Sequence, residues 1–259
     1  MTTYKISIVT VCLGQLSKAQ WSLRSILGQE RSDIQWVVVT PEKGAELAEW
    51  LDKKPYGDMK FTTVSGRNRY EAMRTGVELA DGEYVLFLEA GNRFYSSTSL
   101  KEAIEKLDNL RPDILVGSTE YLTRYGIKVV HVLPFDVVSR ELPFRLESAF
   151  IRRELLLQHP FDTRYRWAGD YAFLHGLPPV TIKQLRYPVV VVNRQHWWSN
   201  PHSVELEREY RLIQGRMQST RDRLGWLGYL GGRMVSNFLR MILPDCLFAN
   251  RENNKDLYR

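Results

Sequence analysis

The stretch that decides the fold, residues 66–95, reads GRNRYEAMRTGVELADGEYVLFLEAGNRFY. Its first part has apolar residues at helical spacing, and an Asp-Gly pair then supplies the turn chemistry that ends a helix. The apolar run at 84–88, YVLFL, is typical of a strand buried on both faces. The polar loop at 89–92 therefore stands at the carboxyl end of a buried strand, where open α/β sheets bind ligands.

Strands and helices alternate on both sides of this stretch, which predicts a parallel, doubly wound α/β sheet. The strands expected from β-branched and apolar runs are residues 4–11, 34–39, 61–64, 84–88, 113–116 and 188–192. Helices are expected at 41–51 and 99–110, and a hairpin is expected between 120 and 133. From Glu205 onward the pattern is helical and basic, although Gly231-Gly232 weakens a continuous helix.

A length of 259 residues suits one large α/β domain, or one domain with a tail. The hydrophobic content of 44% is that of a soluble globular protein. A net charge of +6 suits anionic partners such as nucleotide diphosphates or phospholipid headgroups, or describes an ordinary basic surface. No recognition module favours nucleic acid as a partner.

Cysteine usage and hydropathy bear on location. The two cysteines, Cys12 and Cys246, are far apart and give neither a metal motif nor a disulfide framework, which favours a reducing compartment. The N-terminal run lacks the features of a signal peptide, and no stretch reaches the length of about 18 apolar residues expected of a spanning helix. These features favour a cytoplasmic location.

Three pieces of the central stretch share their order and spacing with a known pattern. They read YEAMRTG at 70–76, ADGEY at 80–84 and FLEAGN at 87–92. They resemble the Y-D-A-M-N-x-G, A-x-G-E-Y and acidic-loop segments of the family 2 glycosyltransferases, particularly the bacterial polysaccharide and colanic-acid-type enzymes. These enzymes are inverting and use nucleotide-sugar donors on a GT-A fold, a Rossmann-like, mostly parallel sheet flanked by helices.

The resemblance implies an organisation of the chain. Residues 1–200 would form the GT-A domain, with a nucleotide-sugar-binding half at 1–116 and an acceptor half at 117–200. Residues 201–259 would form a helical, basic extension.

A second segment, residues 161–174, reads FDTRYRWAGDYAFL. It resembles the F-D-E-x-Y-x-x-x-x-D-Y-D segment that carries the catalytic aspartate of the family, which implies that Asp170 is the general base. An aspartate at a helix N-terminus is also an ordinary capping residue. The preceding F-D-x-x-Y and the position about 80 residues after the acidic loop favour the base.

The family loop ends in an aspartate that binds Mg²⁺ or Mn²⁺, and this metal binds the donor diphosphate. Here the loop offers Glu89 and Asn92, and His196 is a candidate third ligand. Alternatively, arginines neutralise the phosphates directly, and Arg67 and Arg69 stand where the family lines its donor pocket. The sequence leaves open whether a metal ion or arginine side chains neutralise the diphosphate.

The donor-binding residues implied by the resemblance are Thr10, Cys12, Leu13, Thr40, Arg67, Arg69, Glu71, Glu89 and Asn92. Leu13 replaces a family aromatic residue, and Thr40 replaces an aspartate that contacts the base or ribose. The nucleotide is therefore not defined by these positions.

Together these residues favour an inverting, hexosyltransferase-type enzyme that acts on a lipid-linked or surface-polysaccharide acceptor. The alternative is a degenerate GT-A protein that serves as a scaffold in glycan assembly. The basic aromatic segment 219–243 would lie on the inner face of the cell membrane as a peripheral anchor, or would pack on the domain as an ordinary helix. A dinucleotide-binding oxidoreductase is disfavoured, because no G-x-G-x-x-G follows the first strand.

Overall fold

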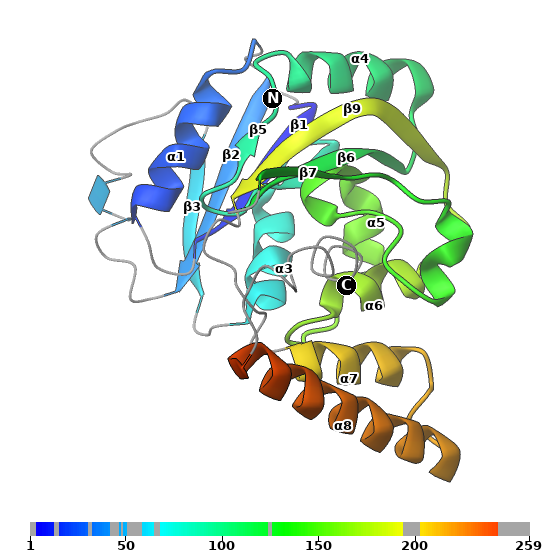
Figure 1. Ribbon diagram of the computed structural model, residues 1–259. Coiled ribbons are helices and arrows are strands. Elements are labelled where there is room, and N and C mark those ends of the chain that lie inside the picture. Colours follow the sequence, from blue (N-terminus) through cyan, green and yellow to red (C-terminus); the bar gives the residue numbers. More distant parts are fainter. Residues whose placement is uncertain are drawn as a thin grey trace.

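The computed structural model (Figure 1) describes residues 4–12, 16–30, 33–41, 47, 49–50, 59–64, 68–123, 126–193 and 203–242. The strands are β1 (Ile6–Val11), β2 (Ile34–Pro41), β3 (Met59–Val64), β4 (Tyr84–Phe87), β5 (Arg93–Phe94), β6 (Ile114–Thr123), β7 (Gly126–Val130), β8 (Ala149–Arg152) and β9 (Ile182–Asn193). The α-helices are α1 (Leu16–Leu27), α3 (Arg69–Leu79), α4 (Ser99–Leu110), α5 (Arg153–Gln158), α6 (Gly169–His175), α7 (Ser203–Ile213) and α8 (Thr220–Ile242). Two short 3₁₀ helices are η1 (Phe135–Ser139) and η2 (Leu146–Ser148).

The described strands form one sheet in the order β3-β2-β1-β4-β8-β6-β9-β5, with β7 paired to β6. The first four strands of this order are parallel, as the alternation of strands and helices predicts. The second half mixes directions, because β8 is antiparallel to both β4 and β6, whereas β6 and β9 are parallel. This confirms the α/β sheet and the hairpin, which is β6–β7. The helix expected at 41–51 falls largely outside the described residues.

Two apolar layers cover the two faces of the sheet. In β4, Tyr84 and Leu86 join the layer beneath α1 and α4, whereas Val85 and Phe87 join the layer beneath α3, α5 and α6. Every residue of β4 is buried, which explains why its sequence is continuously apolar. The parallel strands therefore all end at one edge of a rigid, two-sided core.

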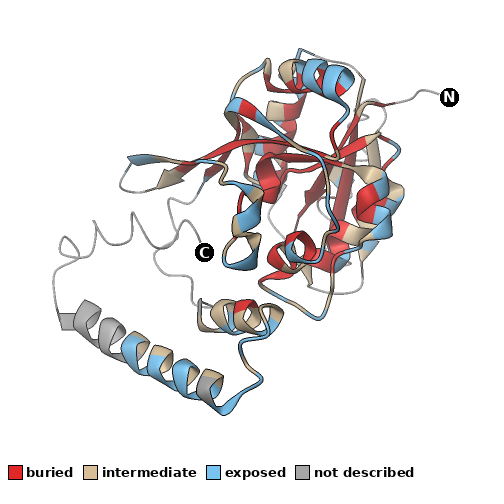
Figure 2. Ribbon diagram, turned by 90° about the vertical axis from the view of Figure 1, so that its right-hand side faces the viewer, coloured by how far each residue is buried: buried red, intermediate tan, exposed pale blue. Residues whose placement is uncertain are grey.

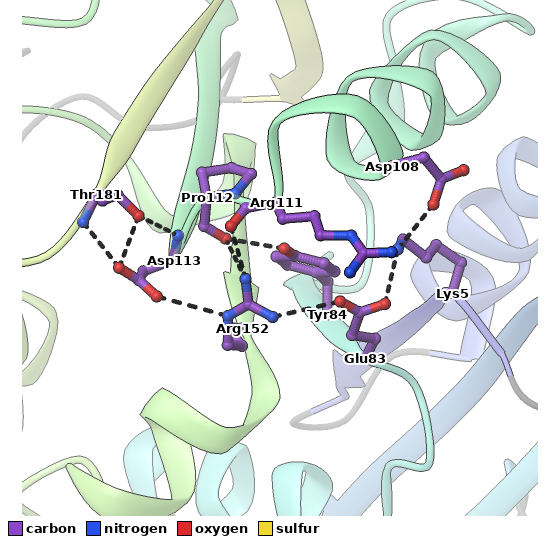
Figure 3. A network of polar contacts seen from close by, with 9 residues as sticks. All are labelled: Lys5, Glu83, Tyr84, Asp108, Arg111, Pro112, Asp113, Arg152 and Thr181. Atoms are coloured by element: carbon purple, nitrogen blue, oxygen red, sulfur yellow. Dashed lines mark hydrogen bonds and ion pairs between the residues drawn. The ribbon is translucent and has the colours of Figure 1, made fainter.

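Charged residues tie the strands together at the opposite edge, where the parallel strands begin (Figure 3). Lys5, before β1, pairs with Glu83, before β4, at 2.6 Å. Asp113, before β6, accepts hydrogen bonds from the backbone N–H and hydroxyl of Thr181, at 2.8 and 2.7 Å. Arg152, at the end of the antiparallel β8, lies 3.3 Å from Glu83 and 3.5 Å from Asp113. These contacts stabilise the sheet and leave its other edge for ligands.

The last two described helices run side by side beneath the sheet domain (Figure 1). α7 packs on the domain through the buried Tyr210, which belongs to the same apolar layer as α6. α8 carries mostly exposed residues over its described part (Figure 2). It is continuous through Gly231-Gly232, contrary to expectation, because a glycine costs a helix only about 1 kcal/mol relative to alanine and does not break it.

Candidate active site

The loop after β4 is a tight turn that α1 holds in place. The backbone N–H of Asn92 donates to the carbonyl of Glu89 at 3.0 Å. The hydroxyl of Ser22 in α1 lies within hydrogen-bond distance of the carbonyl oxygens of Glu89 and Asn92 and accepts a bond from the N–H of Gly91. Gly91 has φ of +99°, a conformation that glycine adopts without strain. The side chains of this turn are therefore presented at a fixed place at the ligand-binding edge.

Arg69 pairs with the acidic residue of this turn. Arg69 is the first residue of α3, and the side chain of the N-cap residue Asn68 accepts a hydrogen bond from the N–H of Tyr70. Nη2 of Arg69 lies 2.7 Å from Oε1 of Glu89. The structure thus brings together two of the residues expected at the donor site.

Asp170, the expected general base, lies in the first turn of α6 against α3. Its Oδ1 accepts a hydrogen bond from the N–H of Tyr171 at 2.8 Å. The hydroxyl of Tyr70 shares its one hydrogen between Oδ1 of Asp170, at 3.2 Å, and the carbonyl oxygen of Trp167, at 3.0 Å. A side chain at the neighbouring Gly169 would place its Cβ 2.6 Å from the Tyr70 ring, so only glycine allows this approach. Asp170 is not the N-cap of its helix, which is Ala168, and its carboxylate lies instead against Tyr70 of the helix that carries Arg69.

The surroundings of Asp170 favour a basic carboxylate. Burial is the largest influence on the pKa of the Asp170 carboxyl and raises it. The positive charges of Arg69 and Arg145 lower this pKa without cancelling the rise. For Arg69, burial alone would lower the guanidinium pKa, but the nearby carboxylates, led by Glu89, raise it overall. Arg69 thus acts electrostatically on both Glu89 and Asp170.

Sequence reasoning missed two buried charged residues next to η2. Arg145 and Glu147 are 8% and 9% exposed. Burial alone would lower the pKa of Arg145, but neighbouring acidic groups, including Glu147 and Asp170, raise it overall. The available signal was the segment PFRLESAF at 143–150, which sets charges inside an apolar run. Such residues are rarely buried unless they are paired.

Sequence reasoning also missed the part that α7 plays. Glu209 accepts hydrogen bonds from three consecutive backbone N–H groups, those of residues 166, 167 and 168, at 3.0, 2.9 and 2.7 Å. Tyr210 stacks on Tyr171 with ring centroids 4.2 Å apart, and Gln214 donates to the Tyr171 hydroxyl at 3.0 Å. α7 thus holds the segment that leads into Asp170. No local sequence pattern indicates contacts between residues about 40 positions apart in the chain.

The other expected donor residues lie in less exposed or more distant places. Thr10 and Thr40 are buried at the ends of β1 and β2; the hydroxyl of Thr10 accepts from Trp36, and that of Thr40 donates to the carbonyl of Cys12. Cys12 itself is 1% exposed. Glu71 is exposed and lines a polar hollow on α3. Leu13, Arg67 and His196 lie outside the described residues.

Glu71 and Arg69 point in different directions. Two residues along a helix correspond to a turn of about 200°, so these side chains do not face each other. The hollow that Glu71 lines is bounded by Asn68, Glu71, Arg74, Thr75, Glu78 and Thr163. Its role in donor binding stays a prediction.

The described residues do not fit a divalent cation at this turn. They include no group of three or more His, Cys, Asp or Glu side chains that could hold a metal. Glu89 is already paired with Arg69, and Asn92 is 5% exposed with its Nδ2 lacking a hydrogen-bond partner. A hard cation needs several oxygen ligands, and this turn offers one occupied carboxylate.

Comparison with known proteins places the chain among glycosyltransferase-like proteins. No family model matches it. It is 22% identical over 152 residues to proteins from two Mycobacterium tuberculosis strains, CDC 1551 and H37Rv, each named an uncharacterized glycosyltransferase. The match covers 58% of this chain and 55% of the relatives, so the chain spans about half of their length.

Solved structures share the fold. S. aureus TarS, residues 1–349 in complex with UDP, matches with a TM-score of 0.61 and 16% identity, covering 83% of this chain and 66% of that one. A mannosyltransferase from Pyrobaculum calidifontis, in complex with GDP-Man and Mn²⁺, matches with a TM-score of 0.58 and 17% identity, covering 85% and 65%. The chain is therefore similar in sequence to proteins named glycosyltransferases, and it shares the fold of a solved mannosyltransferase.

Proposed function

We propose that the protein is an inverting glycosyltransferase that moves a sugar from a nucleotide-sugar donor to an acceptor hydroxyl. The observation that carries the proposal is the position of Asp170. It was expected as the base from sequence, and it is bonded to the helix that places Arg69 against Glu89. The structural neighbours support a nucleotide-sugar donor, because they were solved with UDP, UDP-GlcNAc and GDP-Man.

In the proposed reaction Asp170 takes the proton of the acceptor hydroxyl. Among the described residues, its two hydrogen bonds both go to Oδ1, which leaves Oδ2 for the acceptor. The acceptor oxygen forms a bond to the anomeric carbon from the side opposite the diphosphate. The bond between that carbon and the diphosphate oxygen breaks, the nucleoside diphosphate leaves with the electron pair, and the anomeric configuration inverts. The proton then passes from Asp170 to solvent.

Burial suits Asp170 to this step. A carboxyl whose pKa is raised holds a proton more strongly than an exposed carboxyl, so its ionised form is a stronger base. Arg69 and Arg145 limit the rise and help keep the group ionised. The arrangement follows the usual tuning of a carboxylate by burial and neighbouring charge.

The proposed acceptor is a lipid-linked or surface-polysaccharide glycan, reached from the inner face of the membrane. In the described part of the chain no helix is long and apolar enough to cross a bilayer. α8 supports a peripheral contact, because Leu224 and Leu227 are 63% and 60% exposed. On its other side Trp226 and Tyr229 pack against Arg211 of α7. An outward apolar face on a basic helix is the pattern of an interfacial anchor.

The test is the variant Asp170→Asn, assayed by release of UDP or GDP from UDP-GlcNAc and GDP-mannose in the presence of lipid-linked glycan acceptors. Removing a general base lowers turnover about 10²–10⁴-fold, and donor binding should change little. The matched control is Asp162→Asn in the same segment, because Asp162 pairs with the exposed Arg164. Full activity of the Asp170 variant would overturn the proposed role.

A further inference from the structure

The turn after β4 is already paired with a positively charged side chain, that of Arg69. Nη2 of Arg69 lies 2.7 Å from the carboxylate of Glu89, which is the single acidic residue of residues 89–92. This pair is formally neutral. A divalent cation would have to displace the guanidinium and then find further oxygen ligands, and the described residues do not provide such a group.

Arg69 and the turn after β4 each carry a buried N–H donor that lacks an acceptor among the described residues. Nε of Arg69 and Nδ2 of Asn92 have no hydrogen-bond partner in the described structure. Buried donors without partners are costly and uncommon in folded proteins. Both groups offer hydrogen atoms, whereas a metal ion requires lone pairs. Their natural complement is a ligand rich in anionic oxygen atoms.

The Arg69 side chain is placed to meet such a ligand. It is 31% exposed, so a bound molecule can reach it. An arginine guanidinium keeps its positive charge at any pH at which the protein is folded. A guanidinium binds phosphate oxygens through two parallel hydrogen bonds, and Glu89 holds Arg69 by one nitrogen and leaves the buried Nε without a partner.

We propose that Arg69 binds the diphosphate of the donor directly and takes the place of a divalent cation, so that donor binding requires no metal. This inference rests on the proposed function, because it assumes a nucleotide-sugar donor. Glu89 acts as a positioning residue that fixes the guanidinium, and Asn92 donates to the same phosphate oxygens. When the bond to the anomeric carbon breaks, the charge that develops on the diphosphate falls next to Arg69.

The experiment is titration calorimetry of the full chain with UDP and with GDP, each in EDTA and in Mn²⁺. We expect one nucleotide to bind with dissociation constants that agree within about twofold in the two media. Arg69→Met should weaken that binding at least about tenfold in both media, the loss expected for a charge-assisted contact. Arg74→Met is the matched control, because Arg74 lies on the same helix and lines the separate polar hollow. Circular dichroism confirms that each variant is folded.

A second variant distinguishes binding of the diphosphate by Arg69 from binding through a metal ion. Glu89→Gln removes the negative charge on which a metal site would depend but keeps an oxygen that can accept a hydrogen bond from Nη2 of Arg69, so binding in EDTA should stay within about threefold. Binding that requires Mn²⁺, or that survives Arg69→Met unchanged, would overturn the inference and leave the glycosyltransferase intact. Binding of neither nucleotide in either medium would overturn the inference and the proposed function together.

Discussion

Glu209 should control the catalytic segment from outside the site. Its carboxylate accepts hydrogen bonds from the backbone N–H groups of residues 166–168, which lie immediately before the helix that carries Asp170. In Glu209→Gln the amide keeps one accepting oxygen and turns an NH₂ group toward a backbone donor. At least one charged hydrogen bond is then lost, and each such bond contributes about 1.5–3 kcal/mol.

The expected loss of stability is about 2 kcal/mol, which lowers the unfolding midpoint by about 4–8 °C in a domain of this size. The catalytic effect should be larger than the change in fold implies. A displacement of about 1 Å at a reacting group can cost about 10²-fold in rate, so kcat should fall about 10–100-fold. The KM for the donor should stay within about threefold, because the residues placed at the diphosphate lie on α3 and the turn after β4.

The assay is steady-state kinetics at a temperature well below the unfolding midpoint, so that both proteins are fully folded. Glu205→Gln is the matched control, because it makes the same substitution at an exposed position of the same helix. A purely structural role for Glu209 predicts a lower midpoint with unchanged kcat. That result would exclude a role for Glu209 in placing Asp170.

Three further predictions concern Asp170, the far edge of the sheet and α8. Because the pKa of Asp170 is raised in the fold, its ionised form lowers stability as pH rises, so Asp170→Asn should raise the unfolding midpoint at pH 7. Hydrogen bonds from Thr181 are the main reason that the pKa of Asp113 is lowered. Asp113→Asn should therefore lower the free energy of unfolding by about 1–2 kcal/mol at pH 7. This difference should vanish as the pH falls through the lowered pKa of Asp113. Replacing Leu224 and Leu227 by glutamate should weaken binding to anionic vesicles at least about tenfold without lowering the midpoint.

Each of these predictions has a contradicting result, and two of them have a matched control. Asp108→Asn removes an exposed carboxylate of the same network and should change stability less than Asp113→Asn; equal losses would contradict the role given to Thr181. Leu212→Glu alters an exposed leucine of α7 and should leave vesicle binding unchanged. Unchanged vesicle binding by the α8 variant would remove the membrane contact. A lower midpoint for Asp170→Asn would mean that its ionised form stabilises the fold.

The order of strands and helices could be predicted because local chemistry decides it. The run at 84–88 was expected to be buried on both faces, and β4 contacts both apolar layers. The helix expected at 99–110 is α4, with the same bounds, because its apolar residues recur at helical spacing. The motif at 161–174 singled out Asp170 as the proposed base, and its carboxylate lies beside Tyr70 of α3.

The site could not be completed from sequence because its remaining parts are long-range contacts. The pairing of Arg69 with Glu89 joins residues 20 apart, on a helix and on a turn after a strand. The positions of Arg145 and Glu209 depend on how η2 and α7 fold back onto α6, and periodicity carries no information on that docking. The sequence left open whether a metal or arginines would neutralise the diphosphate at the turn after β4, and the described residues include no group that could hold a metal.

The most direct test of the account is the thermal unfolding of the full chain with UDP, GDP, UDP-GlcNAc and GDP-mannose. A ligand that binds only the folded state at about 100 times its dissociation constant adds about 2.7 kcal/mol, and each kcal/mol raises the midpoint of such a domain by about 2–4 °C. We expect a clear rise with the ligands of one base, both in EDTA and in Mn²⁺. No rise with any of the four would contradict donor binding and favour a scaffold that keeps the fold without the reaction.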